Sequence, residues 1–323
     1  MTKQIVLMPP NWLGDVVLAQ PALRAITTQH KDAKTLVFGR GWLPELLPFL
    51  NLEHASVQFV SELPKKSDAV FLFPNSLRSA WQAWKSGAKQ RIGFRKDGRS
   101  LLLTHGYNPR IDLITQHHLF YYLDLLQQYG LQTPFEEVEL VAPDDAKTKA
   151  QILLLNKGLD INKVVCVAPG AQFGGAKRYP GESYAVVLEH LSAQGWHIVV
   201  LGTDAERDIA TQCLQHITNS CWNAAGETSL TEALQLVSVA KLMLCNDSGL
   251  MHVAAGLGVP TVTMFGATNP ARTSPSGKRV QVLYKPAKCS PCLQRECDVQ
   301  DHPCMGNILP EHVIQACDDF LNV

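Results

Sequence analysis

The stretch Asn246-Asp247-Ser248-Gly249-Leu250-Met251-His252 decides how we expect this chain to fold. Short apolar runs at 241–245 and 261–265 flank it, and each has the length of a buried strand. Between them, residues 250–257 form a small-residue helix that ends at Gly258. Strand, turn, helix and strand in this order indicate a parallel α/β sheet, in which ligands bind at the carboxyl ends of strands and helix N-termini face anions. We therefore expect Asp247, Ser248, Gly249 and His252 to lie at a ligand site. The alternative is a helix-capping aspartate and a packed histidine.

The same alternation continues through the rest of the chain, which predicts parallel sheet throughout. We expect strands at 5–8, 35–38, 57–60, 69–73, 90–94, 164–167 and 197–201, and helices at 16–28, 42–50, 76–85, 117–129, 147–157, 183–194, 204–217, 230–239 and 310–320. Pro21 should interrupt or kink the first of these helices. Because the pattern restarts near residue 160, we predict two doubly wound domains, 1–158 and 159–323. The last helix, 310–320, could pack on either domain.

Length and composition allow this arrangement. The chain has 323 residues, 46% of them hydrophobic and 18% charged, which is enough for two domains of ordinary size. A net charge of zero and a pI near 7.1 give no indication of nucleic-acid binding. The first apolar run, residues 5–8, is too short for a signal peptide, and no run reaches the roughly 18 residues of a membrane span. We expect a cytoplasmic protein whose nine cysteines are mostly reduced.

A glycine-rich turn after the strand at 164–167 is the second candidate for anion binding. Gly170, Gly174 and Gly175 would let the backbone approach an anion, and Lys177 supplies positive charge. The turn is not a Walker A sequence, and G-x-G-x-x-G follows no strand, which disfavours P-loop and NAD-binding functions. A surface turn with a solvated lysine is the alternative.

The first half offers Gly14 and Asp15 at the start of a helix. A helix N-terminus favours the carboxylate form of Asp15, so this group could accept a proton from a hydroxyl. The alternative is an ordinary N-cap.

Basic residues dominate between Arg78 and Arg110, where Asp97 is the only acid. Such an excess on a neutral protein suggests an anionic partner, although a solvated face is the alternative. Arg78 and Arg95 follow strands and are the candidates for substrate contact. The basic residues of this stretch are Arg78, Lys85, Lys89, Arg91, Arg95, Lys96, Arg99 and Arg110.

Four cysteines near the C-terminus, Cys289, Cys292, Cys297 and Cys304, form C-x2-C-x4-C-x6-C. Four thiols so close together can hold zinc or an iron–sulfur cluster, but only the first pair has the usual spacing. A reduced structural loop is the alternative.

Taken together, these motifs resemble the family 9 glycosyltransferases, the lipopolysaccharide heptosyltransferases, and among them those that add the second heptose. The resemblance rests on five strings that span nearly the whole chain. They are residues 11–24, 73–80, 91–94, 169–180 and 246–268, followed by the cysteine-rich tail.

The resemblance implies a GT-B fold, with two Rossmann-like domains and a cleft between them. It implies inverting transfer of L-glycero-D-manno-heptose from ADP-heptose to heptose I of the anionic lipopolysaccharide inner core, without a required cofactor. Asp15 would be the general base, and Arg78 and Arg95 would bind the acceptor. The donor-binding residues would be Gly14, Gly170, Lys177, Glu206, Asp247, Ser248, Gly249 and His252.

Two other functions stay open. One is a heptosyltransferase I or another nucleotide-sugar transferase of the same fold, and the other is a non-catalytic module with a metal-bound tail. Because the implied acceptor is a lipid, we also expect peripheral contact with the inner face of the inner membrane. Trp81, Trp84 and Lys85 are candidates for it, unless the tryptophans form a buried pair.

Overall fold

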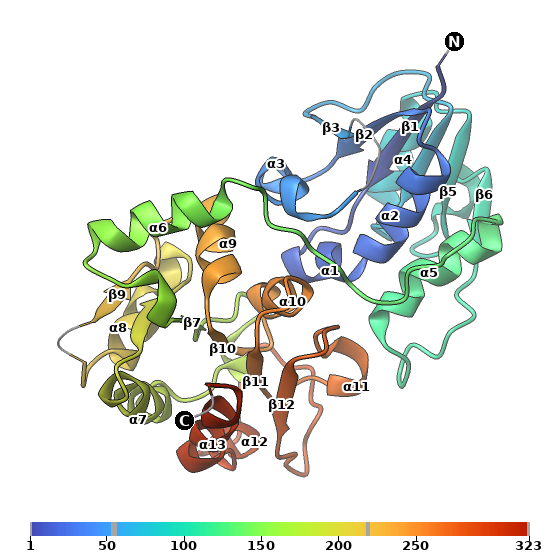
Figure 1. Cartoon of the computed structure of the whole chain (residues 1–323). Helices are drawn as coiled ribbons and strands as arrows, with labels where there is room; N and C mark the ends of the chain where they lie inside the picture. Colours follow the sequence, from blue (N-terminus) through green and yellow to red (C-terminus); the bar gives the residue numbers. More distant parts are fainter. Residues whose placement is uncertain (1, 53–56, 218–219, 322–323) are drawn as a thin grey trace. The chain divides into compact units, whose positions relative to one another are not determined.

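The computed structural model describes residues 2–52, 57–217 and 220–321 (Figure 1). It divides into two compact units, Met1–Val141 and Ala142–Val323. Each unit contains a six-stranded, fully parallel sheet with helices on both faces. These paired Rossmann-like units are the components of a GT-B fold, as the sequence predicts. No described helix is both long and apolar enough to cross a bilayer.

The first sheet has the order β3-β2-β1-β4-β5-β6. Its strands are β1 (Gln4–Met8), β2 (Lys34–Phe38), β3 (Val57–Val60), β4 (Ala69–Leu72), β5 (Gln90–Phe94) and β6 (His105–Tyr107). Alternate side chains point to opposite faces of a strand, so Val70 and Leu72 pack on one helix layer while Phe71 meets Tyr129 on the other. The helices of this unit are α1 (Leu13–Leu18), α2 (Gln20–Gln29), α3 (Leu43–Leu46), α4 (Leu77–Lys85) and α5 (His118–Tyr129).

The second sheet has the order β12-β11-β10-β7-β8-β9, so it repeats the winding of the first sheet. Its strands are β7 (Val164–Ala168), β8 (His197–Val200), β9 (Cys221–Asn223), β10 (Leu242–Asn246), β11 (Thr261–Phe265) and β12 (Val280–Tyr284). Its helices are α6 (Ala146–Asn156), α7 (Gly181–Ala193), α8 (Arg207–Cys213), α9 (Leu230–Val239), α10 (Gly249–Gly256), α11 (Pro270–Thr273), α12 (Pro303–Gly306) and α13 (Pro310–Leu321). In both sheets the winding reverses beside the first strand, between β1 and β4 and between β7 and β10. Ligands bind at such switch points in open α/β sheets.

The structure differs from the sequence-based expectations in several places. The expected helix 16–28 is two helices that meet at Ala19, with Pro21 in the first turn of α2. The expected helix 42–50 is the short α3 followed by a 3-10 turn. The outer strands β6, β9 and β12 were not predicted, because β6 and β9 are very short and β12 is only half-buried.

The two ends of the second unit also differ from the prediction. The unit begins at Ala142 rather than near residue 159, because α6 packs against α9. The C-terminal helix α13 belongs to the second unit. Its buried residues Val313, Ala316 and Cys317 belong to the core of the second unit, together with α7.

Candidate functional site

The switch point of the second unit brings together the two predicted anion-binding stretches. Lys177 lies in the turn after β7, and Asp247 follows β10 directly. The Lys177 Nζ is 2.6 Å from the Asp247 Oδ2, and their side chains are only 14% and 5% exposed. The Thr268 hydroxyl donates a 2.5 Å hydrogen bond to the same carboxylate oxygen. Sequence reasoning missed Thr268, although it closes one of the strings that carry the family resemblance.

Asn246 fixes the geometry of this switch point, and it was also missed. Its amide nitrogen donates to the Pro169 carbonyl at 2.5 Å. Its amide oxygen accepts from the Tyr179 backbone and the Tyr184 hydroxyl, both at 3.1 Å. All these groups are buried, so each bond is shielded from water. Asn246 therefore ties the two ends of the glycine-rich turn to the end of β10.

Ser248 and Gly249 begin α10 as predicted. Ser248 is the N-cap residue, but its side chain makes no capping bond. Its Oγ is buried and has no hydrogen-bond partner in the described part of the chain. The first amides of α10 therefore lack a side-chain acceptor from Ser248, an arrangement that suits an anion. His252 is buried on the same helix.

Gly170 and Glu206 have a structural relationship that the sequence does not reveal. A Cβ on Gly170 would lie 1.9 Å from the Glu206 Oε1, so the glycine leaves room for this carboxylate. The other oxygen, Oε2, accepts from the Thr203 backbone at 2.8 Å and the Thr203 hydroxyl at 2.9 Å. Glu206 thus forms a capping box at the end of β8, and one carboxylate oxygen is engaged there.

In the first unit, Gly14 and Asp15 lie in α1, directly after the β1 turn. Burial raises the pKa of the Tyr122 hydroxyl well above its ordinary value, and the nearby Asp15 charge raises it further. The His118 ring stacks on Tyr121 with centroids 5.2 Å apart, and meets Tyr122 edge-on at 5.0 Å. Asp15 therefore lies near an aromatic group at the start of α5, beside the first switch point.

Several basic side chains between Arg78 and Arg110 already bind other groups of the protein, so they are not free to bind an anionic partner. Arg99 is fully buried and donates to the carbonyls of Phe94 and Pro74, and burial lowers its pKa to about 10. Arg91 donates to backbone carbonyls, Arg110 pairs with Asp124, and Lys89 pairs with Asp68. Arg78 and Arg95 are exposed after β4 and β5, so both remain available for an anionic ligand.

Burial raises the pKa of the Cys304 thiol, and the nearby thiols of Cys289, Cys292 and Cys297 raise it further. Cys289 is exposed, Cys304 is buried against Gly266, and the Cys297 thiol donates to the Val299 carbonyl. Across residues 2–52, 57–217 and 220–321, no three Cys, His, Asp or Glu side chains form a group that could hold a metal ion. The zinc or iron–sulfur centre at these cysteines stays a prediction.

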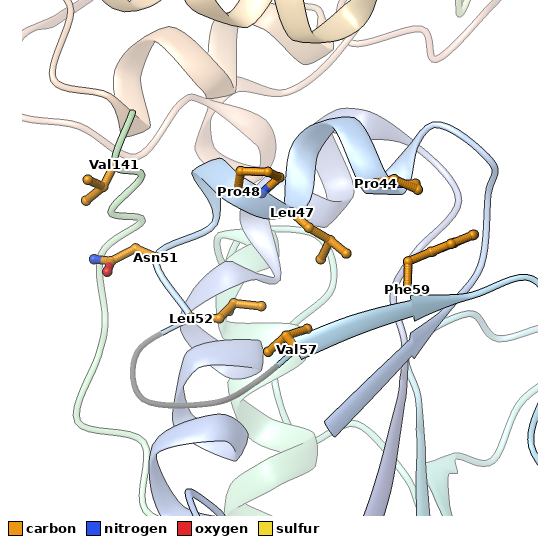
Figure 2. Close-up of a pocket in the computed structure, with 8 residues that line it drawn as sticks. All are labelled: Pro44, Leu47, Pro48, Asn51, Leu52, Val57, Phe59 and Val141. Atoms are coloured by element: carbon orange, nitrogen blue, oxygen red, sulfur yellow. The ribbon is translucent and has the colours of Figure 1, made fainter. Parts of the chain in front are cut away.

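The first unit also has a surface hollow of about 570 Å³ near α3 and β3 (Figure 2). Among the described residues that line it, none belongs to either switch point and none is charged. The hollow is lined by Pro44, Leu47, Pro48, Asn51, Leu52, Val57, Phe59 and Val141. It is therefore a poor candidate for binding an anionic sugar nucleotide.

Comparison with known proteins shows that the chain is similar to glycosyltransferases. The sequence profile of glycosyltransferase family 9 (heptosyltransferase) matches residues 57–302. The chain belongs to this family.

Particular relatives extend the likeness to the whole chain. Lipooligosaccharide heptosyltransferase 2 of Haemophilus ducreyi is 26% identical, over 98% of this chain and 99% of that protein. Lipopolysaccharide heptosyltransferase 1 of Pseudomonas aeruginosa is 29% identical, but over only 44% of this chain and 42% of its own. The solved structure of Escherichia coli ADP-heptose lipopolysaccharide heptosyltransferase II has the same fold, with a TM-score of 0.82, 24% identity, and coverage of 99% and 98% of the two chains.

Proposed function

We propose that this glycosyltransferase moves L-glycero-D-manno-heptose from ADP-heptose to heptose I of the lipopolysaccharide inner core, with inversion. The observation that carries the proposal is the likeness to heptosyltransferase 2 enzymes along 98% of the chain, against a partial likeness to a heptosyltransferase 1. The polar groups at both switch points support the same reaction.

In the proposed reaction, an acceptor hydroxyl oxygen attacks the anomeric carbon of the donor, and the bond from that carbon to the phosphate oxygen breaks. Asp15 takes the hydroxyl proton as general base. ADP leaves with the bonding electron pair, and Lys177 together with the first amides of α10 stabilises its negative charge. The proposal gives Asp247, Ser248, Gly249 and His252 the sugar and phosphate contacts, and places Glu206 near adenosine.

We assign acceptor binding to Arg78 and Arg95. Both are exposed, and they follow neighbouring strands of the first sheet. A phosphorylated, acidic sugar acceptor would pair with such guanidinium groups. Gly106 supports the placement of Arg95, because a Cβ there would lie 3.0 Å from the Arg95 Nε.

We also propose that the first unit contacts an anionic bilayer from the cytoplasmic side. Trp81 and Trp84 are 50% and 48% exposed, so the alternative of a buried tryptophan pair is wrong. Leu77, Arg78 and Lys85 are exposed on the same helix, while Ala80 and Ala83 face the core. Aromatic and basic side chains on one helix face suit the headgroup region of an anionic membrane.

The decisive experiment measures transfer from ADP-heptose to two acceptors, one ending in heptose I and one carrying only the Kdo residues. Product on the first acceptor alone is the expected result. Product on the Kdo acceptor alone would reassign the chain to heptosyltransferase I. A preference for another nucleotide sugar across a donor panel would favour the broader alternative.

A further inference from the structure

The cysteine-rich segment, residues 287–304, crosses the glycine-rich turn after β7 and is hydrogen-bonded to it. The Ala176 backbone N–H donates to the Arg295 carbonyl at 2.9 Å. The Gly175 N–H donates to the Glu296 Oε1 at 3.0 Å, and the His302 Nε2 lies 3.0 Å from the Ala176 carbonyl oxygen. Lys177 directly follows Ala176 in the sequence, so these bonds hold the backbone next to Lys177.

The two adjacent glycines of the turn are required by this crossing. A Cβ on Gly174, whose φ is 153°, would lie 2.1 Å from the Arg295 carbonyl oxygen. A Cβ on Gly175 would lie 2.3 Å from the Glu296 carboxylate. A side chain at Gly174 would collide with the Arg295 backbone, and one at Gly175 would displace the Glu296 carboxylate. The glycines therefore allow close approach of this segment, rather than only of a ligand.

The crossing brings a second cation to the ring that already carries Lys177. The Lys177 Nζ lies 4.9 Å from the Phe173 ring centroid, and the Arg295 guanidinium carbon lies 5.5 Å from it. Both distances are in the range of cation–π contacts. Two positive side chains from distant parts of the sequence thus share one aromatic ring beside the second switch point.

The charges of the two cations are balanced differently. Asp247 already neutralises Lys177 within the protein. Arg295 is exposed, and no carboxylate of the described residues lies within salt-bridge distance of it. A diphosphate at this turn would therefore meet Lys177, whose charge Asp247 neutralises, and Arg295, whose charge no described carboxylate neutralises.

We propose that Arg295 binds the diphosphate of the sugar-nucleotide donor as a second cation beside Lys177, and that Glu296 is a positioning residue that holds the turn under it. The inference rests on the proposed function, because it assigns a further residue to the same donor site. Arg295 suits the role because a guanidinium binds phosphate oxygens in a bidentate way. The cation–π contact with Phe173, 5.5 Å from the guanidinium carbon, restricts where the guanidinium lies.

The test compares binding of ADP and AMP to the full-length protein by calorimetry, for wild type, Arg295→Gln, Arg295→Lys and Lys288→Gln. Lys288 is an exposed cation of the same segment, so its substitution makes the same change of charge away from Phe173. We expect Arg295→Gln to weaken ADP binding about tenfold, as for loss of one charge-assisted hydrogen bond, and AMP binding much less. Arg295→Lys should recover part of the loss, and Lys288→Gln should match wild type.

A matching steady-state experiment separates binding from chemistry. Arg295→Gln should raise KM for ADP-heptose while KM for the acceptor stays constant. Glu296→Ala should lower ADP affinity as well, because the Gly175 amide loses its acceptor. Equal ADP affinity of Arg295→Gln and Lys288→Gln would overturn the assignment while leaving the proposed function standing. Failure of the wild-type protein to bind either ADP or ADP-heptose would overturn both.

Discussion

The Lys177 Nζ lies 2.6 Å from the Asp247 Oδ2, although the two residues come from different strand ends and are far apart in sequence. One follows β7 and the other follows β10, the two strands that flank the switch point of the second sheet. The pair is largely buried, so each charge depends on the other for compensation. Binding of an anionic donor must therefore rearrange this pair or extend it.

Removing one partner of this pair should harm both stability and donor binding. Lys177→Met leaves Asp247 with only Thr268, and we expect a loss of about 3 kcal/mol in the free energy of unfolding, as for other broken buried pairs. Donor affinity should fall at least about tenfold, because the cation nearest the proposed diphosphate is gone. Denaturant unfolding and ADP calorimetry measure the two effects. Lys241→Met is the control, since Lys241 is exposed on the same unit. If both variants behave alike, the pair has no special role.

Asp15→Asn should abolish transfer while donor binding survives. Loss of a general base typically costs about 10²–10⁴ in rate, and the amide keeps the size of the side chain. Initial rates with ADP-heptose and the heptose I acceptor give kcat, and ADP binding is measured separately. Asp32→Asn, which changes an exposed carboxylate of the same unit, should leave both unchanged. Near-normal turnover of Asp15→Asn would contradict the assignment of the base.

Arg99 should be a determinant of stability rather than of acceptor binding. Its guanidinium is fully buried and donates to the Phe94 and Pro74 carbonyls and the Ser79 hydroxyl. Arg99→Met should lower the free energy of unfolding by about 3 kcal/mol, because these acceptors become unsatisfied. Arg78→Met should leave stability unchanged and raise KM for the acceptor. The reverse outcome, with Arg78 controlling stability, would overturn this division of roles.

Alkaline pH should lower the free energy of unfolding, because two buried thiols stay protonated in the folded chain. Burial raises the pKa of Cys166 and of Cys213 from 9.0 to about 12. The unfolded chain therefore loses these protons at lower pH than the folded chain, so their stabilising contribution is complete below pH 9 and is lost between pH 9 and 12. Thermal or urea unfolding across this range should show falling stability. Cys166→Ala with Cys213→Ala should make the decline shallower, and an unchanged slope would show that other groups cause it.

Vesicle binding should depend on the exposed aromatic residues of α4. Trp81→Ser with Trp84→Ser should weaken sedimentation with anionic vesicles by about tenfold or more, because two exposed rings lose their contact with the headgroup region. Neutral vesicles should bind poorly in either case. Leu155→Ser removes an exposed apolar residue of α6 and should have no effect. Wild-type binding that is equal for neutral and anionic vesicles would contradict the electrostatic part of the proposal.

Much of this architecture is readable from local sequence. The periodic apolar runs predict the inner strands of both sheets, and the restart near residue 160 predicts the second unit, because buried parallel strands need continuous β-branched and aliphatic residues. Asp247 stands out because it directly follows such a strand, and Lys177 and Asp15 stand out in the loops and turns that follow two others. The half-buried strand β12 and the three-residue β6 and β9 lack that signal.

Only the tertiary structure decides which polar groups meet. Sequence does not distinguish buried Arg99 from exposed Arg78, because both follow strands and carry the same charge. It does not show that Glu206 fills the space left by Gly170, or that Arg295 crosses Gly174. These contacts join segments far apart in the chain, and their partners are chosen by packing in three dimensions. Local pattern determines the elements and their order, whereas long-range packing determines which charges are buried, paired or left for a ligand.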